Sequence, residues 1–133
     1  MDISFIAEHL WIASKFYELD EDMPPNHFLI DLETIFSDEP LTSETKSATK
    51  ELTEEVQILR GMDFNVVLQC KAGRNRSGLI AAMCLIADGL SPQQALDQIR
   101  AARTSLRHSG GALTNESFRA FILSNEPSRA TTE

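Results

Sequence analysis

The feature that most constrains the fold of this chain is an apolar segment that leads through a polar loop into a second apolar segment. Residues 65–69 read NVVLQ, a β-branched apolar run of strand length. The loop, residues 70–76, contains a glycine, and we predict a helix from Ser77 to about Asp88, closed by Gly89. A strand–loop–helix unit in mid-chain, among other strands and helices, is typical of a layered α/β domain.

Other segments predict the elements around this unit. Residues 3–13 indicate one or two short strands, and residues 28–32 indicate a buried strand. A helix is predicted over residues 43–60, with Gly61 as its stop, because apolar side chains share one face. These side chains are Ala48, Leu52, Val56 and Leu59.

Two shorter helices are predicted towards the C-terminus. Residues 91–94 (SPQQ) have the form of a capping box with proline at the first helical position, and they open a helix that ends near Arg103. A last helix is predicted near residues 115–123. We therefore expect one domain over residues 1–124, with a small, mixed, mostly parallel sheet flanked by helices. A flexible tail is expected over residues 125–133.

Size and composition suit a single globular domain inside the cell. The chain has 133 residues, of which 42% are hydrophobic. No run of about 18 apolar residues predicts a membrane span, and the N-terminus lacks the basic start and apolar core of a signal peptide. Two cysteines do not make a disulfide framework, which favours a cytoplasmic location. His9, His27 and His108 lack the spacing of metal ligands, so we expect no metal.

The net charge of −8 is distributed unevenly along the chain. Residues 1–63 contain 4 Lys or Arg and 15 Asp or Glu, whereas residues 64–133 contain 8 and 5. The second half is therefore the part of the chain that favours a bound anion. The overall acidity argues against nucleic acid as a partner and against stable association with anionic membranes.

Residues 70–76 carry the side chains that we expect to do chemistry. Between a buried strand and a helix N-terminus, the backbone N–H groups of this loop can point inward at an anion, and Gly73 can take the positive φ that such a cradle needs. Arg76 closes the loop and can bind two phosphate oxygens at once. The same surroundings favour the thiolate of Cys70, which is nucleophilic without an adjacent base.

Each of these features has a simpler explanation when it is taken alone. A cysteine at a strand end is usually a small buried apolar residue, and a loop with glycine and arginine is usually a solvated turn. The functional interpretation rests on their combination, with five residues between Cys70 and Arg76, a strand before the pair and an apolar helix after it.

The loop also resembles a known signature. Residues 70–77 match the Cys-x5-Arg-Ser/Thr pattern of the protein tyrosine phosphatases, and residues 70–78 (CKAGRNRSG) are similar to the compact dual-specificity branch, of bacterial or phage type. Weaker matches extend the resemblance over about residues 3–123. They lie at residues 6–14 and 89–92 and at Arg100, Arg103, Asn115 and Phe118.

The resemblance implies a two-step mechanism without a metal or other cofactor. The thiolate of Cys70 attacks phosphorus to form a phosphocysteine, which water then hydrolyses. Arg76 binds the phosphate and the transition state, and Ser77 hydrogen-bonds the sulfur and eases its departure. The phosphate-binding backbone implied by the resemblance is that of Lys71, Ala72, Gly73, Arg74, Asn75 and Arg76.

The family also uses an Asp on a mobile loop, upstream of the nucleophile, as the general acid for the leaving oxygen. Asp38 lies 32 residues before Cys70, with a proline close by, and this position suits the role. Glu39 is the nearest competitor. Asp31 suits the role less well because it falls inside an apolar strand run. The alternative for Asp38 is a solvated turn residue.

Two features depart from the pattern of the family. Gln69 stands where the family has a His before the nucleophile, so we expect weaker support for the thiolate, although not an inactive protein. The segment between residues 28–32 and Asp38 is short, so a strand of the family is missing or abbreviated there. A phosphate-binding protein without activity is therefore one alternative.

The expected partner is a phosphorylated protein, recognised through phosphotyrosine and also through phosphoserine or phosphothreonine, and the expected state is a monomer. Lys71 and Arg74 either attract the dianionic substrate or recognise additional phosphates, as in the similar loop of phosphoinositide phosphatases. Asn75 before Arg76 also occurs in 5′-RNA triphosphatases, but no basic stripe outside the loop supports RNA binding.

Three further residues have a structural and a functional interpretation. Cys84 is predicted to be a small buried residue of the helix that follows Ser77, and the alternative is a thiol that traps oxidised Cys70 as a disulfide. Arg100 and Arg103 are predicted to hold the C-terminal loop rather than to extend the positive field.

Overall fold

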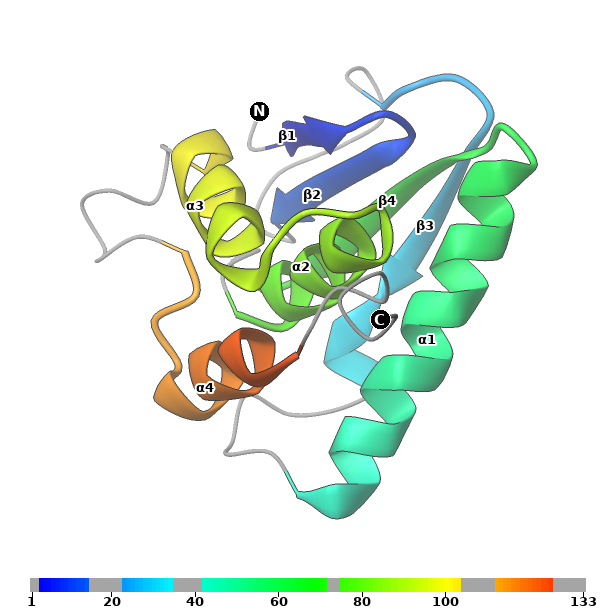
Figure 1. The fold of residues 1–133 in the computed structure, drawn as a ribbon. Helices are drawn as coiled ribbons and strands as arrows, with labels where there is room; N and C mark the ends of the chain where they lie inside the picture. Colours follow the sequence, from blue (N-terminus) through cyan, green and yellow to red (C-terminus); the bar gives the residue numbers. More distant parts are fainter. Residues whose placement is uncertain (1–2, 15–22, 35–41, 72–74, 104–111, 126–133) are drawn as a thin grey trace.

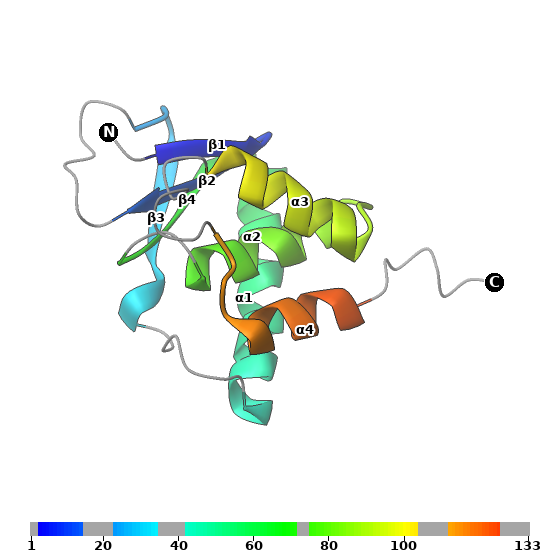
Figure 2. The same ribbon diagram turned by 90° about the vertical axis from the view of Figure 1, so that its left-hand side faces the viewer.

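A four-stranded sheet with helices packed against one face forms the framework of the chain (Figures 1 and 2). The computed structural model describes residues 3–14, 23–34, 42–71, 75–103 and 112–125. In chain order the elements are β1 (Ile3–Ala7), β2 (Leu10–Ser14), β3 (His27–Asp31), η1 (Leu32–Thr34), α1 (Ser43–Gly61), β4 (Asn65–Cys70), α2 (Arg76–Ala87), α3 (Pro92–Ala102) and α4 (Glu116–Ser124).

The sheet confirms the mixed, mostly parallel arrangement. Its strand order is β1-β2-β4-β3; β1 and β2 are antiparallel, and β4 is parallel to both of its neighbours. Ser14 pairs with Cys70, and Asp31 pairs with Gln69. The carboxyl ends of three strands therefore meet at one edge of the sheet, which is where open α/β sheets bind ligands.

The middle strand and the helix after it form the centre of the core. All residues of β4 from Val66 to Cys70 are buried, as expected for a parallel strand with a neighbour on either side. The apolar helix α2 lies across this strand and contacts α1, α3 and α4 (Figure 2). Its residues from Ser77 to Ile86 are buried, so α2 is the central helix of the layer.

Helix α1 differs in two details from the sequence prediction. Gly61 is still helical, and Asp63 takes the left-handed conformation after the helix, with φ of 68°. Thr49 and Thr53 are more deeply buried than the predicted Ala48, Leu52 and Leu59. Their hydroxyls donate to carbonyls one turn earlier, at 2.7 and 2.8 Å, so each buries a methyl group without leaving a polar group unpaired.

The predicted ends of the other helices are confirmed. Gly89 follows α2 with φ of 113°, a conformation that favours glycine. Ser91 and Gln94 form the predicted capping box, with bonds of 3.1 and 2.9 Å, and Pro92 is the first residue of α3. Helix α4 begins after Asn115, whose side chain accepts from two backbone N–H groups.

Among the described residues, no helix combines the length and the apolar character that a membrane span requires. The predicted tail lies, apart from Asn125, outside the described residues.

Candidate active site

The candidate nucleophile lies at the carboxyl edge of the sheet. Cys70 is the last residue of β4 rather than the first residue of the loop, and its side chain is buried. On the neighbouring strand, the hydroxyl of Ser14 donates to the carbonyl of Lys71 at 3.1 Å. The chain is therefore held to β2 one residue after Cys70, and Lys71 itself is exposed at the edge.

Helix α2 begins immediately beyond this edge. Arg76 and Ser77 are its first two residues, and the N-cap residue Asn75 makes no side-chain bond to the first turn. The hydroxyl of Ser77 is fully buried and has no hydrogen-bond partner in the described part of the chain. Because a helix N-terminus and its dipole favour an anion, this end of α2 is suited to a negatively charged ligand.

Asn75 has a structural role that the sequence analysis did not predict. Its side chain is buried; the Oδ1 atom accepts from the backbone N–H of Asn115 at 3.0 Å, and Nδ2 approaches Thr114 Oγ1 at 3.4 Å. The residue joins the start of α2 to the start of α4, 40 positions away. No local pattern signals this contact, because Asn75 and Asn115 are adjacent only in the folded chain.

Residues 112–115, which include the partners of Asn75, are held in place by two arginines. Arg100 donates to the carbonyl of Ala112 at 3.2 Å, and Arg119 donates to the carbonyls of Leu113 and Thr114 at 3.1 and 3.0 Å. Leu113 is fully buried in the left-handed conformation, with φ of 57°.

A side chain at Gly78 would collide with this leucine, because an added Cβ would lie 2.9 Å from Leu113 Cγ. The absence of a side chain at the third residue of α2 therefore lets residues 112–115 pack directly against the start of the helix.

The structural role predicted for the two arginines of the C-terminal pattern was to hold the C-terminal loop. It fits Arg100, whereas the described bond of Arg103 is to β1. Arg103 is 1% exposed and donates to the hydroxyl of Ser4 in β1 at 2.9 Å. Arg100 holds Ala112, as described above. Burial of an arginine is tolerated when its N–H groups are hydrogen-bonded, so Arg103 ties α3 to the sheet instead of facing a ligand.

The two carboxylates predicted as candidates for the general acid belong to the segment before α1. Asp38 and Glu39 lie outside the described residues, as do Ala72, Gly73 and Arg74 of the loop. Asp31, which the sequence disfavoured, accepts the backbone N–H of Glu33 at 3.0 Å. That bond starts the turn η1, so the carboxylate of Asp31 has a local structural use. Asp38 remains the predicted acid.

The second cysteine is confirmed as a small buried residue. Cys84 is fully buried in α2, and burial raises the pKa of its thiol to about 12, although nearby Arg60 acts in the opposite direction. The alternative role of Cys84, as a thiol that traps oxidised Cys70 as a disulfide, stays a prediction.

The histidines that the structure describes are used in ordinary polar contacts. His9 Nδ1 lies 3.1 Å from Asn65 Oδ1, and His27 Nδ1 lies 2.9 Å from the carbonyl of Pro24. Within the described ranges, no group of three His, Cys, Asp or Glu side chains could hold a metal ion. His108 lies outside them.

Known structures share this arrangement over nearly the whole chain. Human DUSP28 aligns with a TM-score of 0.74 and 15% identity, over 98% of this chain and 97% of that one. Tk-PTP in its active form aligns with a TM-score of 0.68 and 19% identity, over 96% and 97%. OH1 of the Orf virus, described as a tyrosine phosphatase with triple substrate specificity, aligns with a TM-score of 0.62 and 14% identity, over 95% and 87%.

The chain therefore has the α/β fold that these three structures share, the dual-specificity-phosphatase-like fold expected from the sequence. At this level of identity, the likeness concerns the fold and not the reaction. No protein-family model and no curated protein sequence matches the chain.

Proposed function

We propose that the chain is a phosphomonoester hydrolase that acts as a protein tyrosine or dual-specificity phosphatase, with Cys70 as its nucleophile. The observation that carries this proposal is the buried hydroxyl of Ser77, without a described partner, at the uncapped start of α2. The helix begins six residues after Cys70, at the carboxyl edge of the sheet. A site of this kind suits a tetrahedral dianion whose oxygens meet N–H groups and a guanidinium.

In the first step, the sulfur of Cys70 attacks phosphorus and an S–P bond forms as the P–O bond to the leaving group breaks. The leaving oxygen takes its proton from Asp38, the acid that the family resemblance implies. Arg76 and the backbone N–H groups of the loop stabilise the charge on the three equatorial oxygens. The product is an alcohol, or a phenol from a phosphotyrosine, and a phosphocysteine.

In the second step, water attacks phosphorus and the S–P bond breaks. The electron pair of that bond returns to sulfur, and the water proton goes to the carboxylate of Asp38. Ser77 assists by donating its hydroxyl hydrogen to the departing sulfur of Cys70. This role suits a hydroxyl that has no described hydrogen-bond partner before the reaction.

Phosphoproteins are the substrate class that we favour. OH1 of the Orf virus, one of the similar structures, is described as a tyrosine phosphatase. Asn75, the residue that suggested a 5′-RNA triphosphatase, has its amide engaged with Thr114 and Asn115, so it supplies no argument for RNA. Lys71 is exposed beside the loop, where it could contact an additional phosphate. A small polyphosphorylated substrate, such as a phosphoinositide headgroup, is therefore the second candidate.

The test is hydrolysis of para-nitrophenyl phosphate against pH, without added metal, by the wild type, Cys70→Ser and Asp38→Asn. We expect turnover by the wild type, none by Cys70→Ser, and slow turnover by Asp38→Asn with loss of the basic limb of the pH profile. A rapid-quench experiment with a ³²P-labelled phosphopeptide then traps the phosphocysteine on the wild type and not on Cys70→Ser.

The outcomes separate the alternatives. An unaffected Asp38→Asn places the acid elsewhere, and Glu39→Gln becomes the next variant. A wild type that binds vanadate but releases no phosphate is a phosphate-binding protein without activity. Faster turnover of inositol phosphates than of phosphopeptides favours the small-molecule substrate.

A further inference from the structure

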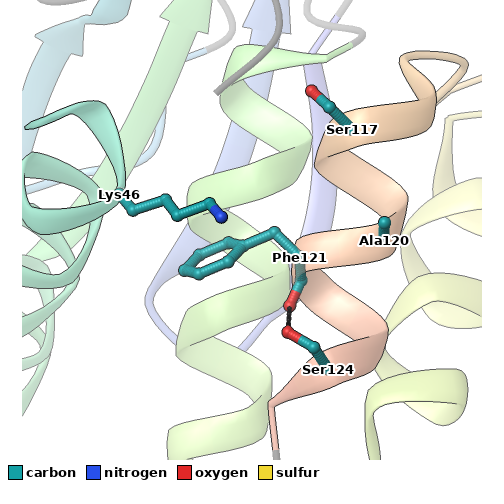
Figure 3. A pocket seen from close by; sticks show the side chains of 5 residues that line it. All are labelled: Lys46, Ser117, Ala120, Phe121 and Ser124. Carbon is teal, nitrogen blue, oxygen red and sulfur yellow. Dashed lines mark hydrogen bonds between the residues drawn. The ribbon is translucent and has the colours of Figure 1, made fainter. Parts of the chain in front are cut away.

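A pocket lies between α1 and α4, and it has no role in the reaction proposed above. Its volume is about 290 Å³. We call it the α1–α4 pocket (Figure 3). It is lined by Lys46, Ser117, Ala120, Phe121 and Ser124. Lys46 reaches across from α1 to the aromatic ring of Phe121 on α4, between Ser117 at one end and Ser124 at the other (Figure 3).

Of the five side chains that line the pocket, we expect that of Lys46 to donate hydrogen bonds to a ligand. The hydroxyl of Ser117 is bonded to Asn115 Oδ1 at 2.9 Å, and that of Ser124 donates to the carbonyl of Phe121 at 2.7 Å. The ammonium group of Lys46 lies 5.7 Å from the centre of the Phe121 ring, a cation–π contact.

The sequence of α1 leaves Lys46 without a carboxylate on its own face. Ion pairs along a helix form between residues three or four positions apart. The acidic residues nearest to Lys46 in α1 are Glu44 and Glu51, two and five positions away. Within the described part of the chain, no ion pair of Lys46 is present. A positive charge over an aromatic floor is complementary to the carboxylate of a ligand.

The pocket is within reach of a peptide bound at the candidate active site. Asn115, which precedes α4, bonds to Asn75 at the start of α2. Phe121 lies six residues further along α4, or about 9 Å. An extended peptide advances about 3.3 Å per residue, so about three residues span the stretch from Asn115 to Phe121, and a fourth allows for the step from Asn75 to Asn115.

We propose that the α1–α4 pocket binds an acidic side chain of the phosphoprotein substrate, three or four residues from the phosphorylated residue. The carboxylate pairs with Lys46, and the methylene groups of the acidic side chain pack on Phe121. The inference rests on the proposed function, because it needs a phosphoprotein at the active site. It adds a sequence preference to that function.

The experiment compares kcat/KM for phosphotyrosine peptides that differ only in Glu against Gln, placed three or four residues before or after the phosphotyrosine. For at least one position we expect the wild type to prefer Glu by about threefold to fivefold, the range of a partly exposed ion pair. Lys46→Glu inverts the preference, Lys46→Gln abolishes it, and Lys46→Arg retains it. The matched control is Lys50→Glu, one turn further along α1 and exposed, which keeps the wild-type preference.

Equal turnover of the Glu and Gln peptides at all four positions overturns the inference, as does an equal loss of preference in Lys46→Glu and Lys50→Glu. Turnover of para-nitrophenyl phosphate by the wild type separates the two proposals. If that turnover is present and the peptide preference is absent, the pocket assignment alone fails. If that turnover is absent, the proposed function fails and the pocket assignment falls with it. Thermal melting of each variant identifies any loss of folding.

Discussion

The two ends of β4 contain similar residues but differ in whether a buried polar group is left without a described partner. At the amino end, Arg60 donates twice to the carbonyl of Glu8, at 3.1 and 2.8 Å, and also to Gln57 and Asp88. At the carboxyl end, the hydroxyl of Ser77 is buried without a described partner.

Each end also has an arginine, an asparagine and a cysteine. Asn65 at the amino end contacts His9 and Pro25, and the thiol of Cys84 is enclosed near Arg60. The comparison teaches that residue type alone does not mark a site. Arg60 makes its hydrogen bonds inside the protein and stabilises the fold, whereas the buried hydroxyl of Ser77, which has no described partner, can meet a ligand beside Cys70.

The strongest test of this contrast is selective alkylation. Iodoacetamide at neutral pH should modify Cys70 and not Cys84, and should lower phosphatase activity by at least about 10³-fold, because the nucleophile is lost. Cys84 is fully enclosed and its pKa of about 12 keeps the thiol protonated. Mass spectrometry of the digested protein identifies the site, and inorganic phosphate should protect it. Modification of Cys84 at an equal rate would remove the contrast.

Alkaline pH should weaken the fold through Cys84. Its pKa rises from 9.0 to about 12 on burial, so above pH 9 the unfolded chain releases a proton that the native protein retains. This contribution to stability is complete below pH 9 and is lost as the pH rises towards 12. At pH 10.5 the wild type should lose about 2 kcal/mol more than Cys84→Ala does, each relative to its own value at pH 8. Urea unfolding measures both, and equal losses would contradict the assignment.

Replacement of Asn75 should affect both stability and turnover. In Asn75→Ala the backbone N–H of Asn115 loses its acceptor, which should cost about 1–3 kcal/mol of unfolding free energy. The start of α2 should then be held less firmly, with a fall in kcat of about tenfold.

Asn75→Asp is the informative companion variant. It keeps an oxygen for Asn115 but adds a negative charge beside the phosphate site, so it should keep most of the stability and weaken vanadate binding. Unchanged activity in Asn75→Ala would show that the contact between α2 and α4 does not position the site.

The smallest expected effect on stability is that of Ser77→Ala, which should stabilise the fold, whereas Asn75→Ala should destabilise it. Ser77→Ala removes a buried hydroxyl without a described partner, so it should stabilise the fold by about 1 kcal/mol. The same change should lower kcat and increase the fraction of trapped phosphocysteine, because the departing sulfur loses its donor. Rapid-quench kinetics and urea unfolding give both quantities. Destabilisation by Ser77→Ala would mean that the hydroxyl has a structural use.

The parts of the fold that follow from local pattern were predictable. The capping box at Ser91 and the glycine after α2 depend on residues within four positions of one another, and both occur as expected. The strand over residues 65–69 was also predicted, although β4 continues to Cys70. Cys70 belongs to the strand and not to the predicted loop, because it pairs with Ser14 on β2.

By itself, the sequence determined the order of strands and helices, the position of Cys70 before a helix start, the glycine that ends α2 and the capping box that begins α3. These features arise from backbone preferences and from hydrogen bonds over three or four residues. The tertiary structure alone decided that Asn75 meets Asn115, that Arg103 is buried against Ser4, and that Lys46 lies over Phe121. Each of these pairs is brought together by the packing of helices and strands far apart in the chain, which no local pattern encodes.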